Sequence, residues 1–176
     1  TSRRQRQMCI RDSVFCGENT SYIMALRMGG AAPHLGMVLT KGSFSAYSIE
    51  RDLKLQSNDR GCFWLHPSAQ EFAPGDTMKL EWKVFPHRGR EDFREKLRAF
   101  PRVILVDAEQ YVIYPGETSK VTIEPTFPAE KVTINGASLE KTENGVYEYL
   151  FENEKTGEYV LSICADAVSY THLTLP

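Results

Sequence analysis

Apolar side chains recur at every second position in residues 77–85, and this alternation constrains the fold more than any other feature of the sequence. Met78, Leu80, Trp82 and Val84 fall on one face, whereas the intervening Thr, Lys and Glu side chains fall on the other. A period of two is that of a half-buried antiparallel strand. We therefore expect Trp82 to lie in a hydrophobic core with its three apolar neighbours.

Comparable short strands follow one another along the chain, with Gly, Pro and Asn turn signals between them. Before residues 77–85, strands are expected at residues 22–28, 35–40, 43–49 and 62–66. After Pro101 they become shorter and evenly spaced, at residues 103–107, 111–114, 120–124, 132–135, 146–151 and 159–164. This spacing predicts β-sandwiches, and the change in character indicates a domain boundary near residues 100–103.

Two kinds of turn are specified by the sequence. Asn135-Gly136 suits a type I′ hairpin turn, because both central residues of that turn need positive φ. Pro74-Gly75 and Pro115-Gly116 are each followed by an acid and a threonine, and they predict type II turns with glycine at the positive-φ position.

A single amphipathic helix is expected at residues 91–100. Phe93, Leu97 and Phe100 fall at i, i+4 and i+7 and form one apolar stripe. Pro101 ends the helix, because proline lacks the backbone N–H and clashes with the preceding turn. We expect the helix to pack on a sheet as a connector rather than to bind a partner.

The two ends of the chain resemble translated oligonucleotide rather than protein sequence. Residues 3–13 read as a transposase adapter used to tag sequencing libraries, and residues 168–176 read as its reverse complement. Such segments are set aside before fold reasoning. We therefore divide the chain into two domains, at residues 14–100 and 101–166. The flanking residues 1–13 and 167–176 are assigned to the adapter and are expected to be disordered. The domains are then a fragment of a longer protein from assembled environmental DNA.

Composition and charge exclude several classes of function. A hydrophobic content of 41% with 11% aromatic residues is ample for packed cores and excludes a disordered chain. Without the five charged adapter residues, the 21 basic and 23 acidic side chains become 17 and 22, a net charge of −5. This argues against nucleic acid as a partner, which needs clustered Lys and Arg. No segment approaches the roughly 18 apolar residues of a membrane span.

Recognisable catalytic and metal-binding motifs are missing from the sequence. It contains no nucleophile elbow, phosphate-binding loop, dinucleotide fingerprint or zinc-protease motif. The spacing of the cysteines fits neither a metal-binding pair nor a disulfide framework. We therefore expect Cys16, Cys62 and Cys164 to act as small buried hydrophobic side chains. No cofactor and no metal is expected.

Acidic residues are numerous, but their spacing identifies no catalytic pair. Glycoside hydrolysis needs two carboxylates facing each other across about 5–10 Å. Glu50, Asp52 and Asp59 lie near a polar turn without forming such a pair, so the catalytic residues stay unknown. Asp107 and Glu109 are expected at a solvated strand edge rather than in a metal site.

The candidate carbohydrate-binding residues lie in the first half of the chain. Trp64 and His66 end one strand, and His87 and Arg88 follow another. Sugars stack on flat aromatic rings and form hydrogen bonds with Arg and His. We expect all four side chains to be accessible at one edge of a sheet, whereas His34 is expected in an ordinary loop.

Four motifs in residues 102–166 carry a family resemblance: Tyr114-Pro-Gly-Glu-Thr, Val132-Thr-Ile-Asn-Gly, Asn144-Gly-Val-Tyr-Glu-Tyr and Gly157-Glu-Tyr. With them the segment resembles bacterial immunoglobulin-like domains. That resemblance implies about seven strands, of which the pattern predicts six. The seventh should begin where the adapter starts, which would leave an unpaired edge that residues 168–173 are β-branched and aromatic enough to fill by accident.

Residues 14–100 carry a second resemblance, through Phe72-Ala-Pro-Gly-Asp-Thr, Leu80-Glu-Trp-Lys-Val-Phe-Pro-His-Arg-Gly and the helix that follows. They resemble the last part of a galactose-mutarotase-like super-sandwich, found beside a helical barrel in glycoside hydrolases and polysaccharide lyases. The expected fold is all-β: the C-terminal part of a super-sandwich, one short connecting helix, and a truncated immunoglobulin-like β-sandwich.

The two resemblances imply a non-catalytic fragment of a bacterial carbohydrate-active enzyme, either a glycoside hydrolase or a polysaccharide lyase. Its partners would be the catalytic domain of the same chain and a polysaccharide or oligosaccharide, in an extracellular or periplasmic location. The alternative is a cell-surface adhesin or structural spacer built from sandwiches. A third, an intact small binding protein, is disfavoured by the adapters.

Overall fold

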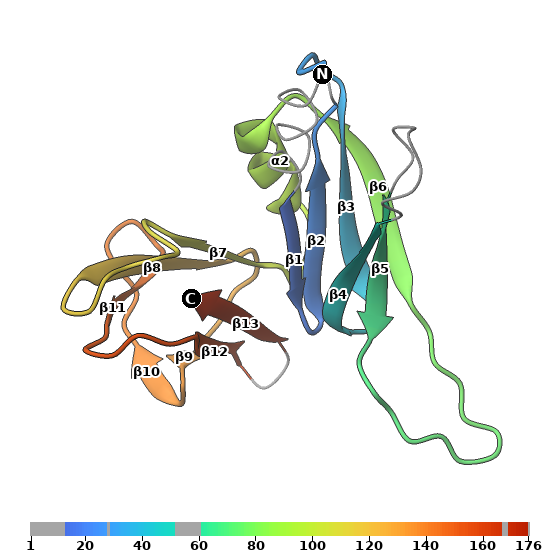
Figure 1. The fold of residues 1–176 in the computed structure, drawn as a ribbon. Helices are drawn as coiled ribbons and strands as arrows, with labels where there is room; N and C mark the ends of the chain where they lie inside the picture. Colours follow the sequence, from blue (N-terminus) through green and yellow to red (C-terminus); the bar gives the residue numbers. More distant parts are fainter. Residues whose placement is uncertain (1–12, 28, 52–60, 167–168, 176) are drawn as a thin grey trace.

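A computed structural model describes residues 13–27, 29–51, 61–166 and 169–175, and these residues form two β modules joined through a helix (Figure 1). The all-β class predicted from the sequence is confirmed. The helix, α2 (Arg90–Leu97), lies where the apolar stripe predicted it, although it ends four residues before Pro101. In the described part of the chain, no helix combines the length and apolar character that a membrane crossing needs.

The first module is built around an antiparallel four-stranded sheet of order β1-β2-β3-β6. A two-stranded hairpin, β4-β5, lies beside it and is tied to it by an isolated bridge between Glu18 and Phe44. The strands are β1 (Ser13–Gly17), β2 (Thr20–Ala25), β3 (His34–Lys41), β4 (Phe44–Arg51), β5 (Gly61–Pro67) and β6 (Glu81–His87).

The second module contains two facing sheets, of order β10-β9-β12-β13 and β11-β8-β7. Alternate residues point into the space between them, so that Val121 and Ile123 of β8 are fully buried. The strands are β7 (Ile104–Ala108), β8 (Thr118–Pro125), β9 (Val132–Ile134), β10 (Ala137–Leu139), β11 (Tyr147–Glu152), β12 (Tyr159–Ala165) and β13 (Ser169–Leu175).

Helix α2 covers one face of the first module's main sheet. Its Phe93 and Leu97, 4% and 0% exposed, pack with Val38 of β3 and with half-buried Phe85 of β6. The helix can approach closely because position 36 is glycine. A Cβ atom at Gly36 would lie 2.6 Å from the Phe85 ring and 2.8 Å from the Phe93 ring.

Strand β7 contributes to the cores of both modules. Ile104 and Val106 belong to the core of the second module, whereas Leu105 and the preceding Val103 pack with Phe93 and its neighbours in the first. A strand buried on both faces has a continuous apolar run rather than an alternating one, which accounts for the sequence Val-Ile-Leu-Val at residues 103–106.

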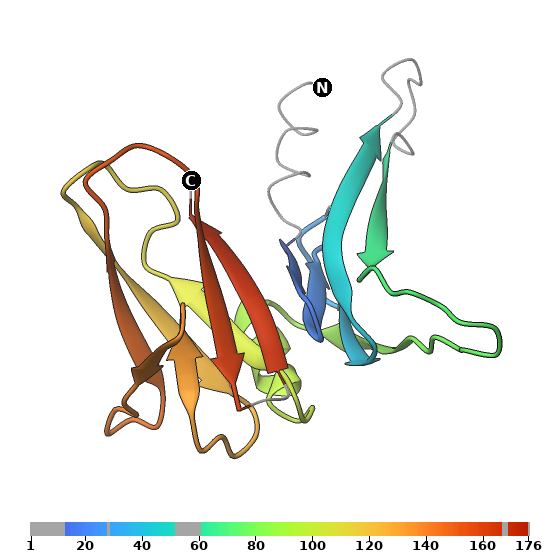
Figure 2. The same cartoon turned by 90° about the horizontal axis from the view of Figure 1, so that it is seen from below.

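Figure 2 shows the two modules on either side of the helix, and polar contacts between side chains add to this junction. Arg94 of α2 forms an ion pair with Asp107 of β7. Arg98 donates two hydrogen bonds to the Glu124 carboxylate, at 2.6 and 3.0 Å. This arrangement lowers the pKa of Glu124, chiefly through the hydrogen bond. The hydroxyl of Thr126 donates to the Phe100 carbonyl at 2.6 Å.

The turns specified by the sequence are present. Gly75 and Gly116 take positive φ values of 97° and 85°, as type II turns require. Both turns have the same pair of hydrogen bonds. In the first, the N–H of Asp76 donates to the Ala73 carbonyl, and the N–H of Ala73 donates to the Asp76 carboxylate. Glu117 and Tyr114 form the same two bonds in the second turn. Asn135 and Gly136, at 48° and 84°, form the expected positive-φ pair.

The strand predicted at residues 77–85 is wrong in part, the strand predicted at 111–114 is wrong, and so is the predicted burial of Trp82. Residues 77–80 and 111–114 are not strands, and Trp82 is 53% exposed rather than buried. The alternation placed Trp82 and Val84 correctly on one face of β6. That face is not the one that α2 covers, so its apolar side chains remain accessible within the described residues.

The segment assigned to the C-terminal adapter is ordered over residues 169–175, so the expectation of disorder is wrong there. It forms β13, which pairs with β12 from Ala165↔Ser169 to Tyr159↔Leu175 and provides the seventh strand of the second module. The physical reason is that a sheet edge offers unpaired N–H and C=O groups to any extended segment. Residues 1–12 and 167–168 lie outside the described residues.

Candidate functional site

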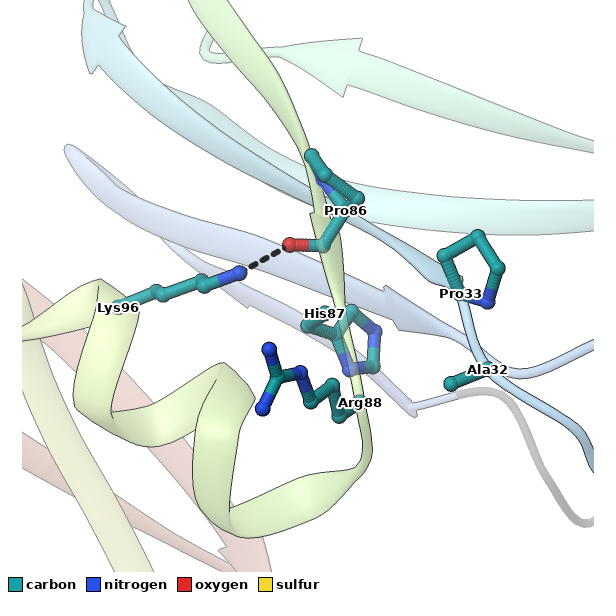
Figure 3. A pocket seen from close by; sticks show the side chains of 6 residues that line it. All are labelled: Ala32, Pro33, Pro86, His87, Arg88 and Lys96. Atoms are coloured by element: carbon teal, nitrogen blue, oxygen red, sulfur yellow. Dashed lines mark hydrogen bonds between the residues drawn. The ribbon is translucent and has the colours of Figure 1, made fainter.

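The candidate site is a hollow of about 420 Å³ at the end of β6, where the strand leaves the sheet and turns into α2 (Figure 3). Two parts of the chain that are distant in sequence meet there: the residues before β3, and the end of β6 with helix α2, which follows it. The lining residues are Ala32, Pro33, Pro86, His87, Arg88 and Lys96.

His87 forms the buried wall of this pocket. It is 1% exposed, it is paired with His34 across β3 and β6, and its ring lies 5.3 Å from that of His34 and 5.1 Å from that of Phe93. Nδ1 lies 3.0 Å from the Gly89 carbonyl oxygen. Nε2 is buried without a hydrogen-bond partner, which is uncommon for a buried polar atom.

Cationic side chains form the open side of the pocket. Arg88 is exposed, and its backbone N–H donates to Asp92 at 2.7 Å, which lowers the pKa of that carboxyl. Lys96 donates to the Pro86 carbonyl oxygen at 2.6 Å and lies 3.4 Å from Asp92. The open side of the pocket therefore presents a guanidinium and an ammonium, a donor-rich pair suited to hydroxyl or anionic oxygens, whereas Nε2 of His87 is buried in its wall.

Trp64 and His66 lie on a different element, strand β5 of the hairpin. Trp64 is 53% exposed, and Nε2 of His66 is 2.8 Å from the Ser48 hydroxyl oxygen on β4. The expectation that these two residues share one accessible sheet edge with His87 and Arg88 is wrong. The four residues form two pairs on separate sheets, and His87 is buried.

His34 is also placed differently from the expectation of an ordinary loop. It begins strand β3, is 7% exposed, and its Nδ1 accepts the backbone N–H of Arg27 at 3.2 Å. Its pairing with His87 depends on the register of β3 and β6, which are about fifty residues apart in sequence. No local pattern could have indicated this contact.

The acidic residues considered from the sequence divide into two groups. The side chains of Glu50, Asp52 and Asp59 lie outside the described residues. Asp107 is held by Arg94 and by the Tyr111 hydroxyl at 3.1 Å, and Glu109 lies 3.4 Å from Lys120. Asp107 therefore belongs to the part-buried ion pair at the junction between the modules, and Glu109 to an exposed ion pair.

The described residues include side chains of metal-binding types and two cysteines. In the described ranges, His, Cys, Asp and Glu nowhere cluster in threes that could hold a metal ion. Cys16 and Cys164 are free thiols and half-buried rather than fully buried. Burial raises the pKa of the Cys16 thiol to about 11, which keeps it protonated and unreactive near neutral pH.

Comparison with known proteins gives a likeness to a solved structure. No protein-family profile matches the chain, and neither does any curated protein. Among solved structures, a chain described as a polysaccharide lyase superposes with a TM-score of 0.76 and 31% sequence identity. The match covers 96% of this chain and 26% of the lyase, so the chain spans about a quarter of that protein's length. The chain is therefore similar to a domain of a carbohydrate-active enzyme.

Proposed function

We propose that the chain is a non-catalytic β-sandwich portion of a bacterial carbohydrate-active enzyme, a polysaccharide lyase or a glycoside hydrolase, that positions the catalytic part and contacts the glycan. The observation that carries this proposal is the likeness to a polysaccharide lyase, which extends over 96% of this chain but only 26% of the lyase. The same likeness favours this function over a cell-surface adhesin or spacer.

The use of charged residues at the module junction supports a positioning role. Arg94 and Arg98 of α2 are bound to Asp107 and Glu124 of the second module. These carboxylates hold the two modules together, whereas a catalytic pair would face an open cleft. We propose that the first module is the end of a galactose-mutarotase-like super-sandwich and that the second is immunoglobulin-like, in an exported protein.

Two surfaces of the first module are candidates for the glycan contact. The exposed Trp64 ring on β5, beside His66, offers a stacking surface with an adjacent hydrogen-bonding group. The pocket at the end of β6 offers the guanidinium of Arg88 and the ammonium of Lys96. A glycan that contacts both would bridge the hairpin and the main sheet.

The test is to titrate the chain and its variants with a panel of soluble polysaccharides and to measure the binding free energy by calorimetry. Trp64→Ala should weaken binding by about 1–3 kcal/mol, the contribution of a stacked aromatic anchor. Trp82→Ala is the matched control, because Trp82 is equally exposed, at 53%, but lies on the other sheet. The isolated chain should form no unsaturated sugar product, measured by ultraviolet absorbance.

Two results would contradict the proposal. One is turnover of a polysaccharide by the isolated chain. The other is glycan binding that Trp64→Ala and Arg88→Ala leave unchanged, or that only the Trp82 control weakens.

A further inference from the structure

The β4–β5 hairpin carries Trp64 and His66 and is attached to the rest of the first module at one end. Its two strands pair with each other as a separate two-stranded sheet. The bridge between Glu18 and Phe44 ties this sheet to the main sheet at the end where β4 begins and β5 finishes. Figure 2 shows that the hairpin extends away from the main sheet beyond this base.

Beyond its base, the hairpin carries exposed aromatic side chains on both faces. Tyr47 and Ser48 are neighbours on β4, so their side chains point to opposite faces, and Trp64 is paired with Ser48. Tyr47 is 45% exposed and Trp64 is 53% exposed. A two-stranded hairpin is only marginally stable by itself in water. The orientation of Trp64 therefore depends on the contacts that hold the base of the hairpin.

One carboxylate binds both ends of the hairpin at this base. Ser43 directly precedes β4, and Ser68 directly follows β5. Their hydroxyls donate to the same oxygen of Glu18, Oε2, at 2.7 and 2.6 Å, and the two hydroxyl oxygens contact each other. The Glu18 carbonyl also accepts the N–H of Phe44 at 3.0 Å. We call Glu18, Ser43 and Ser68 the carboxylate clamp.

The turn between β1 and β2 does not by itself favour glutamate at position 18. Glu18 has a φ of 52°, in the left-handed region that glycine and asparagine adopt more readily than other residues. A residue held in such a conformation persists where the surrounding contacts over-determine it. Hydrogen bonds to an ionised carboxylate are about twice as strong as neutral ones. The contacts of the clamp therefore account for the presence of glutamate in this turn.

We propose that Glu18 is a positioning residue for the glycan contact, and that its carboxylate fixes the hairpin so that Trp64 and His66 meet the glycan in one orientation. The identity of the ligand rests on the proposed function, whereas the fixed orientation rests on the hydrogen bonds of the clamp. Ordering a mobile segment during binding costs free energy, so a pre-organised ring binds more tightly. Loss of the clamp should therefore weaken glycan binding although Trp64 itself is unchanged.

The first test is hydrogen exchange of the chain and its variants, measured by mass spectrometry. Glu18→Gly removes the carboxylate and relieves the backbone strain, whereas Glu18→Gln keeps an oxygen that can accept from both hydroxyls. Glu18→Gly should speed exchange of the β4 and β5 amides about tenfold, the scale of one hydrogen bond to a charged group. The double variant Ser43→Ala/Ser68→Ala should do the same, and Glu18→Gln should have a smaller effect.

The control for the glycine substitution is Arg102→Gly, because Arg102 also has a positive φ, 75°, and an exposed side chain. This change should leave exchange in the hairpin at the parent's rate. Unchanged hairpin exchange in Glu18→Gly would overturn the proposal. An equal rise in β2 and β3 would overturn it too, because Glu18 would then support the whole module rather than the hairpin.

The second test is a double-mutant cycle on glycan affinity, with laminarin, alginate and polygalacturonate as the soluble polysaccharides. Glu18→Gly should weaken binding about tenfold, and it should have little further effect once Trp64 is replaced by alanine, because Glu18 acts through Trp64. The midpoint of urea denaturation should stay at the parent's value, which separates positioning from overall stability. Losses of affinity that add in full would show that Glu18 and Trp64 act independently, and the proposal would be wrong.

The two tests distinguish failure of the clamp from failure of the proposed function. If none of the three polysaccharides binds the parent chain while Glu18→Gly still speeds exchange in the hairpin, the proposed function fails and Glu18 still positions the hairpin. If a polysaccharide binds and Trp64→Ala weakens its binding, but Glu18→Gly changes neither exchange nor affinity, the proposed function stands and the positioning role of Glu18 is refuted.

Discussion

Removal of the Phe93 side chain should destabilise the first module more than any surface substitution. Phe93 is 4% exposed, and its ring lies 5.7 Å from that of Phe85, 5.1 Å from that of His87 and 6.1 Å from that of Tyr22. It therefore fills the space between α2 and the main sheet. Phe→Ala changes at such positions cost about 3–5 kcal/mol, because the cavity closes only partly.

The expected net effect is slightly smaller, because alanine favours the helix more than phenylalanine does. This difference returns about 0.5 kcal/mol, so Phe93→Ala should lower the free energy of unfolding by about 2.5–4.5 kcal/mol. The control is Phe72→Ala, which removes the same side chain at a position that is 54% exposed. That change should cost less than about 0.5 kcal/mol.

The assay is urea denaturation followed by circular dichroism, with the slope m compared between variants. A lower midpoint at constant m identifies a change in stability of the folded state. A loss below about 1 kcal/mol for Phe93→Ala, or an equal loss for Phe72→Ala, would refute the assignment of Phe93 to the centre of the first core.

Three further changes should have measurable effects on stability. Arg98 lowers the pKa of Glu124, so the ion pair stabilises the folded state above the ordinary Glu pKa of 4.5, and this stability is lost as pH falls through the lower folded-state pKa. Glu124→Gln should therefore flatten the plot of denaturation midpoint against pH below about pH 4.5. The stability difference should be under about 1 kcal/mol. Gly136→Ala should cost about 1–2 kcal/mol because φ is 84°, whereas Gly29→Ala, with open space around it, should be near neutral in the same denaturation assay. Truncation after Asp166 removes β13 and should increase light scattering on warming, because the edge of β12 is then unpaired.

Local sequence signals predicted the local structure well. The Pro-Gly turns at residues 74–75 and 115–116 have the predicted positive-φ glycines, because the turn type depends on the residues within it. The helix stripe placed Phe93 and Leu97 in a core. The 3.6-residue period of a helix makes such a stripe visible without knowledge of its partner.

Signals that depend on distant partners were not visible in the sequence. The exposure of Trp82 depends on which face of β6 the helix covers, and both faces of that strand carry apolar residues. The segment 111–114 has high β propensity, but Tyr114 begins the Pro-Gly turn and bonds to Glu117, so the segment does not join a sheet. Propensity of this kind is overridden by tertiary context.

The candidate site was predictable only in part for the same reason. His87 and Arg88 were identified by their residue types, and both line the pocket. Lys96 and Ala32 were not, because the pocket forms only when α2 and the chain before β3 converge on the end of β6. The burial of His87 follows from its cross-strand position beside His34.

The position of β7 affects how such a protein can be divided and recombined. Leu105 completes the interior of one module while Ile104 completes that of the other. A gene fusion or an expression boundary near residue 101 would leave the upstream part without one wall of its interior. The two modules should therefore be inherited together and transferred together, because neither interior is complete without β7.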